Sequence, residues 1–390
     1  MTIDRQRWRL AVCAVALVAG ELGCGGSTEV AAGGAGAGAG ASTGAGVGGS
    51  PTAGGGGAPC EDIVATEPMP VAQGLTALRP VISARSDGTF GLAWEAGGQL
   101  FTAIVAADGS MPLSPTPLGA VSAWGEGAIA SHDDEHVVLR FDSQIVVERV
   151  DGEGQISSIP TGIVASLHDV VAGGTGYLLT FAETGNLARA TLGFGNSTLS
   201  ASQLFPDGGL LYCCGGRRWK VGALASGGFA ALWRASSNKN GLDSLRLTAE
   251  GAAVPGTHGF VDVTTVHPEV ASAHGDGALF SSDGELVVIG EDGGLMATAS
   301  FELGVGSASS TGLVVRGAYG TGNGIDWYDM SIDGGGSTLR LRMEPGITSV
   351  DGVPSSATAP RVASDGEGFG VVWLAPPQDV TFAYLVPCTD

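Results

Sequence analysis

The 390-residue chain carries 39 acidic and 18 basic residues, a formal net charge of −21, and lysine only at Lys220 and Lys239. This balance excludes a nucleic-acid-binding protein, which needs clustered basic side chains. The hydrophobic content of 44% is enough for a real core, and the 67 glycines point to a chain rich in turns.

The N-terminal segment has the features of an export signal. Three arginines (Arg5, Arg7 and Arg9) precede an apolar run over residues 10–19, which is too short to span a bilayer. Cys24 follows Glu21-Leu22-Gly23 directly after this run. This segment resembles the lipobox of bacterial lipoproteins, and the resemblance implies a lipoprotein-type signal peptide over residues 1–23, with plain secretion as the alternative.

Residues 24–59 consist almost entirely of Gly, Ala, Ser and Thr. Such a composition cannot bury a core, so we predict a flexible tether. The remaining residues, 60–390, are predicted to form one domain.

A repeated unit organises that domain. The stretch from Pro80 to Trp94 and the stretch from Pro360 to Trp373 both read as a short strand, an Asp-Gly turn, and a Phe-Gly strand that ends on Trp. A third copy ends at Trp233, and four weaker copies end at Phe141, Phe181, Phe280 and Arg316. A further apolar run follows most of these closing positions and supplies a third strand.

The unit recurs roughly every 45 residues, a period typical of propeller blades. We predict an all-β fold, a single β-propeller of about seven four-stranded blades; a β-sandwich or another repeat β fold is the alternative. Residues around Ile63 to Val71 are expected to pair as the outer strand of the blade that starts at Pro360. The signal, tether and repeats together resemble lipid-anchored bacterial propeller proteins, and the segment before Cys24 resembles the lipobox of bacterial lipoproteins. That resemblance implies an acylated Cys24 and a location at the outer membrane or cell surface, against a soluble periplasmic or secreted protein.

Four cysteines remain after the signal and the lipidation site: Cys60, Cys213, Cys214 and Cys388. An even number in an exported chain favours disulfides. Of the three possible connectivities we prefer Cys60–Cys388, which brackets the repeat array, together with Cys213–Cys214. Because neighbouring cysteines can form only a strained ring, two free thiols at 213 and 214 are the alternative.

No established catalytic, nucleotide-binding or metal-binding signature is present. The densest group of possible metal ligands runs from His132 to His136, and we interpret it as a solvated turn between paired strands, with a metal site as the alternative. The prediction therefore includes no metal and no cofactor.

The inner strand of each blade offers a better candidate site. Asp169, Lys220, Glu269 and Arg361 occupy equivalent positions at the start of this strand, and His168 and Trp219 stand one position earlier. If these residues converge, they form a polar ligand-binding pocket in which Trp219 offers a stacking face. The competing interpretation is a ring of mutual salt bridges.

These patterns favour a monomeric, non-enzymatic lipoprotein of the cell surface or envelope, whose propeller binds a protein or glycan partner. The alternative is a secreted carbohydrate-active enzyme that uses Asp169 and Glu269 as its two carboxylates.

Overall fold

The computed structural model describes residues 64–122, 128–209, 219–234, 241–262, 270–274, 277–282, 285–300, 306–308, 313–316, 325–333, 340–345 and 358–386. Within these residues the secondary structure consists of strands and includes no helix. Consequently, this part of the chain holds no helix of the length and apolar character needed to cross a membrane.

The strands form seven antiparallel sheets, which follow one another along the chain. The first sheet contains β3 (Ala77–Ala84), β4 (Thr89–Ala96), β5 (Gln99–Ala106) and β6 (Leu113–Ala120). The second contains β7 (Ala128–His132), β8 (Glu135–Asp142), β9 (Gln144–Asp151) and β10 (Ile156–Pro160). The third contains β11 (His168–Ala172), β12 (Gly176–Glu183), β13 (Asn186–Gly193) and β14 (Gln203–Gly209). The fourth contains β15 (Trp219–Ala223), β16 (Phe229–Trp233), β17 (Leu242–Leu247) and β18 (Gly259–Val261).

The fifth sheet contains β19 (Val270–His274), β20 (Gly277–Ser282), β21 (Glu285–Gly290) and β22 (Leu295–Ser300). The sixth contains β23 (Gly306–Ala308), β24 (Leu313–Arg316), β25 (Ile325–Asp333) and β26 (Arg340–Pro345). The seventh contains β27 (Thr358–Ser364), β28 (Phe369–Ala375) and β29 (Asp379–Val386), with β1 (Val64–Ala65) and β2 (Met69–Ala72) beside β29.

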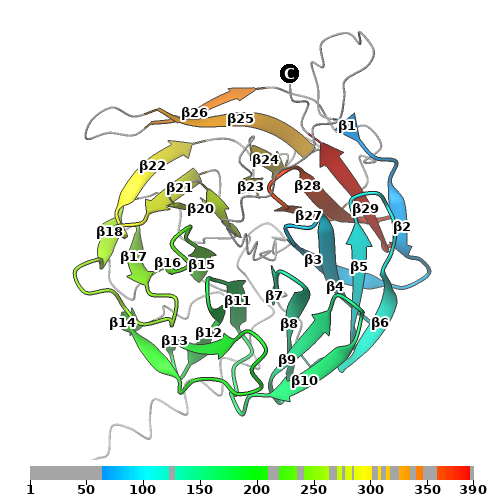
Figure 1. Cartoon of the computed structure of the whole chain (residues 1–390), viewed down its shortest axis with the longest axis horizontal. Helices are drawn as coiled ribbons and strands as arrows, with labels where there is room; N and C mark the ends of the chain where they lie inside the picture. The colour runs from blue at the N-terminus through cyan, green and yellow to red at the C-terminus, as the bar shows by residue number, and fades with distance from the viewer. Residues whose placement is uncertain are drawn as a thin grey trace, which may run out of the picture. The chain divides into compact units, whose positions relative to one another are not determined.

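The first strand of each sheet packs against the first strand of the next sheet, from β3 to β27, and β27 packs in turn against β3. Figure 1 shows these first strands gathered around a common centre, with the later strands of each sheet farther out. This closed arrangement is that of a β-propeller, and the predicted fold class is confirmed.

The seventh sheet joins the beginning of the described chain to its end. Val64 lies opposite Val386, and Met69 lies opposite Phe382, in antiparallel pairs with β29. The expectation that an N-terminal strand completes the blade that starts at Pro360 is confirmed.

The aromatic residues that close the sharp repeats belong to the core. Trp94 and Trp233 are completely buried, and Trp373 is only 1% exposed. They lie on the second strands, β4, β16 and β28, and Trp94 and Trp233 pack in apolar clusters that join neighbouring sheets. The aromatic closing positions of the repeat are therefore explained by burial in the core.

The Phe-Gly pair of the repeat is also explained by packing between neighbouring sheets. A side chain on Gly370 would lie 2.5 Å from the ring of Phe90 in the next sheet, and one on Gly91 would overlap the ring of His136 in the sheet after that. The ring from one sheet thus occupies the space where a side chain on the glycine of the adjacent sheet would lie. A close-packed interior has no room for both the ring and such a side chain.

Several predictions lie outside the described residues. They are the signal peptide over 1–23, the tether over 24–59 with Cys24, the four remaining cysteines (Cys60, Cys213, Cys214 and Cys388), and Glu269. The lipid anchor, the disulfides and the domain bounds of 60–390 stay predictions.

Candidate functional site

Two of the charged residues from the inner strands lie in contact. Asp169 on β11 and Lys220 on β15 form an ion pair, with 2.9 Å between the lysine Nζ and the aspartate Oδ2. Both residues are buried, with 2% and 1% of their surfaces exposed. The Asp169 Oδ1 also accepts a hydrogen bond from the backbone N–H of Val170 at 3.0 Å. This single pair joins two of the four residues for which the sequence offered a ring of mutual salt bridges as the competing interpretation.

Three other predicted site residues, Trp219, His168 and Arg361, are buried in three different sheets. Trp219 is 1% exposed, packs in the apolar core between the third and fourth sheets, and donates its indole N–H to the Thr180 hydroxyl at 2.9 Å. His168 is 8% exposed on β11, and Arg361 is 1% exposed on β27 in the seventh sheet. The indole face of Trp219 therefore packs against protein and is not at the surface.

The segment from His132 to His136 does form the turn between β7 and β8, but its two imidazoles have different partners. His132 stacks on Phe194, with 3.6 Å between the ring centroids. His136 is completely buried, and its Nδ1 shares a hydrogen bond of 2.5 Å with the Ser131 hydroxyl. Burial, with a smaller contribution from the charge of Arg85, lowers the pKa of His136 to about 3. Within the described residues no group of three or more acidic, histidine or cysteine side chains could hold a metal ion.

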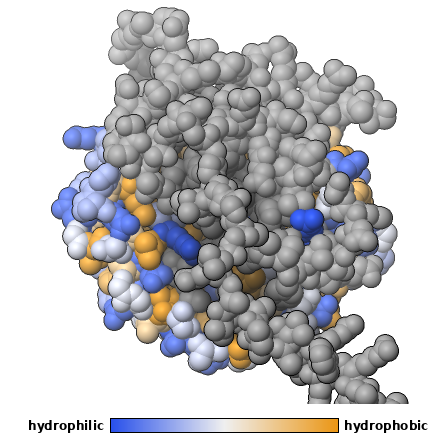
Figure 2. Space-filling model, turned by 180° about the vertical axis from the view of Figure 1, so that it is seen from behind, coloured by the Kyte–Doolittle hydropathy of each residue, from blue (hydrophilic) through white to orange (hydrophobic). Residues whose placement is uncertain are grey.

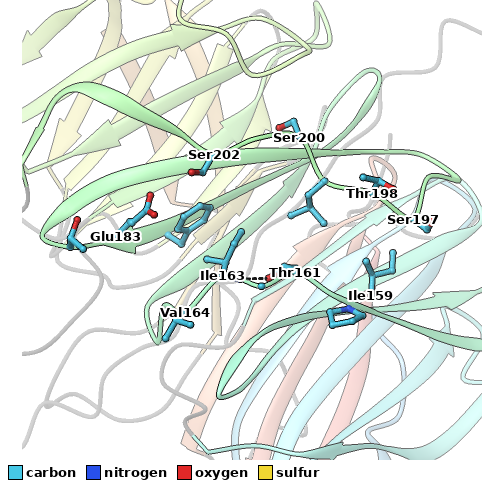
Figure 3. A pocket seen from close by; sticks show the side chains of 14 residues that line it. Ile159, Thr161, Ile163, Val164, Glu183, Ser197, Thr198, Ser200 and Ser202 are labelled. Carbon is cyan, nitrogen blue, oxygen red and sulfur yellow. Dashed lines mark hydrogen bonds between the residues drawn. The ribbon is translucent and has the colours of Figure 1, made fainter.

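An open groove of about 670 Å³ lies between the second and third sheets, away from the inner strands. Figure 3 shows its three walls: the end of β10 with the connection over residues 161–164, the end of β12, and the segment over residues 197–202 that precedes β14. Six hydroxyl side chains line it, from Thr161, Thr184, Ser197, Thr198, Ser200 and Ser202.

The connection after β10 is held to the start of β9 by hydrogen bonds. The Thr161 hydroxyl donates to the Ile145 carbonyl at 2.7 Å, and the Ile145 N–H donates to the Ile163 carbonyl at 2.7 Å. The Thr161 hydroxyl also accepts from the Ile163 N–H at 3.0 Å, a bond drawn in Figure 3. This wall of the groove is therefore preformed.

The opposite segment is fixed from both sheets. Arg149 of the second sheet donates to the Asn196 carbonyl at 2.6 Å, and the Ser200 N–H donates to the Thr191 carbonyl at 2.8 Å. The stacking of His132 on Phe194 adds a contact just before this segment. As a result, the groove keeps its shape without a ligand.

Glu183 is the only charged residue among those that line the groove. It ends β12, and the two-residue turn Thr184-Gly185 that follows has φ angles of 45° and 88°, as in the tight hairpin turns that place both central residues at positive φ. Its side chain is half-buried, and no described residue forms an ion pair or hydrogen bond with its carboxylate.

Figure 2 shows the described part of one face of the molecule. There, hydrophilic and hydrophobic residues are mixed, and the described part of that face shows no continuous apolar area. The groove was not predicted from the sequence.

The fold places the chain in the class of β-propeller proteins, and comparison with solved structures agrees. The chain resembles selenomethionine-substituted virginiamycin B lyase from Staphylococcus aureus, with a TM-score of 0.53, 13% identity, and coverage of 84% of this chain and 100% of the lyase chain. It also resembles the Dos1 propeller (TM-score 0.46, 12% identity, coverage of 78% and 77%) and YCF48 bound to D1 peptide (TM-score 0.45, 13% identity, coverage of 84% and 97%). At 13% identity the likeness to the lyase shows the fold alone, and the other two likenesses, with TM-scores below 0.5, carry no argument. No protein-family model and no curated protein sequence matches the chain.

Proposed function

We propose that this protein is a non-enzymatic binding protein of the bacterial cell envelope, anchored through a lipid on Cys24, whose propeller presents the groove to a protein or glycan partner. The observation that carries the proposal is the groove itself. It is open and preformed, and it combines hydroxyl groups with a carboxylate that has no described partner. Binding sites commonly combine a concave apolar surface with a few fixed polar groups.

The inner-strand residues support binding over catalysis. A carboxyl group that cleaves a glycosidic bond must reach the substrate and exchange a proton with it or attack it. Asp169 is 2% exposed and its Oδ2 lies 2.9 Å from the ammonium group of Lys220, so this carboxylate is already occupied by a buried cation. The proposal therefore does not include the glycoside-cleaving alternative with Asp169 and Glu269.

Binding can be tested with the full chain, purified and immobilised, against a random-peptide display library and a glycan array. We expect saturable binding to members of one of these sets, with no cleavage of the bound molecule by mass spectrometry. Cleavage of a bound glycan would overturn the non-enzymatic proposal, and failure to bind any peptide or glycan would overturn the binding proposal.

The anchor is tested separately by Cys24→Ala. We expect the wild-type chain in the membrane fraction and the variant in the soluble fraction, because the acyl chains provide the membrane affinity. A Cys24→Ala variant that remains with the membranes would contradict lipidation at this residue.

A further inference from the structure

We infer that the groove between the second and third sheets binds an extended, cationic segment of a partner protein, with a lysine or arginine side chain of that segment paired to Glu183. This inference rests on the proposed binding function and specifies the partner class. It is argued from the charge of the groove, from the kind of apolar surface in it, and from its fixed walls.

The charge argument begins with Glu183. A carboxylate that is partly shielded from water is stabilised when an opposite charge approaches it. The residues that line the groove include no lysine, arginine or histidine, and no described residue pairs with this carboxylate. The whole chain has a formal net charge of −21, which attracts cationic ligands and repels anionic ones. A cationic group is therefore the complementary ligand for this position.

The apolar part of the groove favours a polypeptide over a sugar. Its hydrophobic side chains are mainly aliphatic, and Val164 is 75% exposed. The one aromatic residue that lines the groove, Phe181, is completely buried, so its ring face is not available for stacking. Sugar rings generally bind against exposed aromatic faces, whereas aliphatic side chains of a peptide pack well on aliphatic surface.

The hydroxyl groups and fixed walls suit an extended backbone. The hydroxyls of Thr161 and Ser200 are engaged within the protein, whereas no described residue is a hydrogen-bond partner of the hydroxyls of the other four lining residues, Thr184, Ser197, Thr198 and Ser202. These four can both donate and accept, as a backbone with alternating N–H and C=O groups requires. Because the wall at Thr161 and the wall at Ser200 are held by hydrogen bonds to β9 and β13, little ordering is needed on binding. A preformed groove loses less conformational entropy when a ligand binds.

The experiment selects a random decapeptide display library on the immobilised full chain and measures affinities of the selected peptides by fluorescence anisotropy. We expect the selected peptides to carry Lys or Arg beside Val, Ile or Leu. Glu183→Gln should weaken their binding roughly tenfold, because it removes the opposing charge and keeps the side-chain size. The matched control is Glu67→Gln, which removes an exposed carboxylate between β1 and β2 on the seventh sheet.

A second variant, Val164→Lys, adds a cation to the groove at an exposed position, where the substitution should have little effect on the stability of the fold. It should also weaken binding of the selected peptides, with an unchanged melting temperature. Equal weakening by Glu67→Gln would mean that general charge, and not the groove, governs binding, and would overturn the inference.

The remaining outcomes separate the inference from the proposed function. If the chain binds peptides that are neutral or acidic, or if their affinity does not change in Glu183→Gln, the inference is wrong and the binding function stands. The inference is also wrong, and the binding function also stands, if a neutral glycan binds the wild-type chain and Val164→Lys abolishes that binding. If no peptide or glycan binds, both are wrong.

Discussion

Charged residues have opposite environments on the inner strands and in the groove between the second and third sheets. On the inner strands, Asp169 and Lys220 are buried and neutralise each other across two sheets. In the groove between the second and third sheets, Glu183 at the end of β12 stands half-buried without a described partner. Residue types alone did not distinguish the two, because both regions display carboxylates near strand ends.

The difference shows that a charged residue at a repeated position is an uncertain sign of a site. Inner strands of a closed ring pack against neighbours on both sides, so a charge there is buried and needs a partner. Glu183 instead ends β12, beyond the last residue of β12 that pairs with the inner strand β11, so its carboxylate can stay available to a ligand. Three predictions test the buried residues of the sheets, and they are given from the largest expected effect to the smallest.

The largest effect is expected from Lys220→Met. The substitution leaves the Asp169 carboxylate buried without its ammonium partner, and we expect the free energy of unfolding to fall by about 3–5 kcal/mol. Urea unfolding followed by tryptophan fluorescence measures it. The double variant Asp169→Asn with Lys220→Met should be more stable than Lys220→Met alone; if it is equally unstable, the lost stability comes from packing and not from the uncompensated charge.

A smaller loss is expected from Gly91→Ala, because the new methyl group would overlap the ring of His136 in the next sheet. Overpacking of this kind costs about 1–3 kcal/mol, and a displaced ring would also lose its hydrogen bond to Ser131. Gly152→Ala is the control, since a methyl group there meets its nearest neighbour, the Asp134 carbonyl, at 3.4 Å. Equal melting temperatures for the two variants would contradict the role assigned to the Phe-Gly pair.

The smallest effect concerns pH. The pKa of His136 is lowered from 6.5 to about 3 in the folded protein by burial, with the Arg85 charge lowering it further and the Asp87 charge opposing this. The unfolded chain therefore binds more protons than the folded chain below pH 6.5, and stability falls as the pH falls. One such group contributes a loss of roughly 1 kcal/mol between about pH 6.5 and about pH 5.5.

Urea unfolding at the two pH values, compared with His136→Gln, isolates this contribution. The variant should lose less stability than the wild type over the same range. If both lose the same amount, His136 does not carry the dependence.

The sequence repeat made the buried parts of the sheets predictable. The Pro80 and Pro360 stretches, the closing tryptophans and the seventh-sheet closure all follow from apolar residues that must be buried, and the structure confirms them. The outer strands of the first and second sheets, β6 and β10, were not located, because both contain Ser and Pro, β6 is only partly buried and β10 is largely exposed, without the alternation that marks a half-buried strand.

The groove was missed for the same reason, because one of its walls is the end of β10. The run from Ser197 to Ser202 contains four hydroxyl residues, and this was the only local signal in the sequence. It has no fixed spacing that any chemistry requires, and the convergence with Thr161 and Glu183 depends on how two sheets pack. The strand β25 was also not foreseen, since Asp residues interrupt its apolar pattern.

The pairing of β1 and β2 with β29 sets the order of events when the chain is made. The hydrogen bond from the Tyr384 N–H to the Thr66 hydroxyl joins residues 318 positions apart. During synthesis, β1 and β2 can therefore pair only after β29 has been made. Contacts of such long separation form slowly, and during that interval the strand edges are open to wrong pairing. A premature stop codon or a nick that removes β29 would also deprive β1 and β2 of their partner. The seventh sheet is thus complete only in a chain that includes β29.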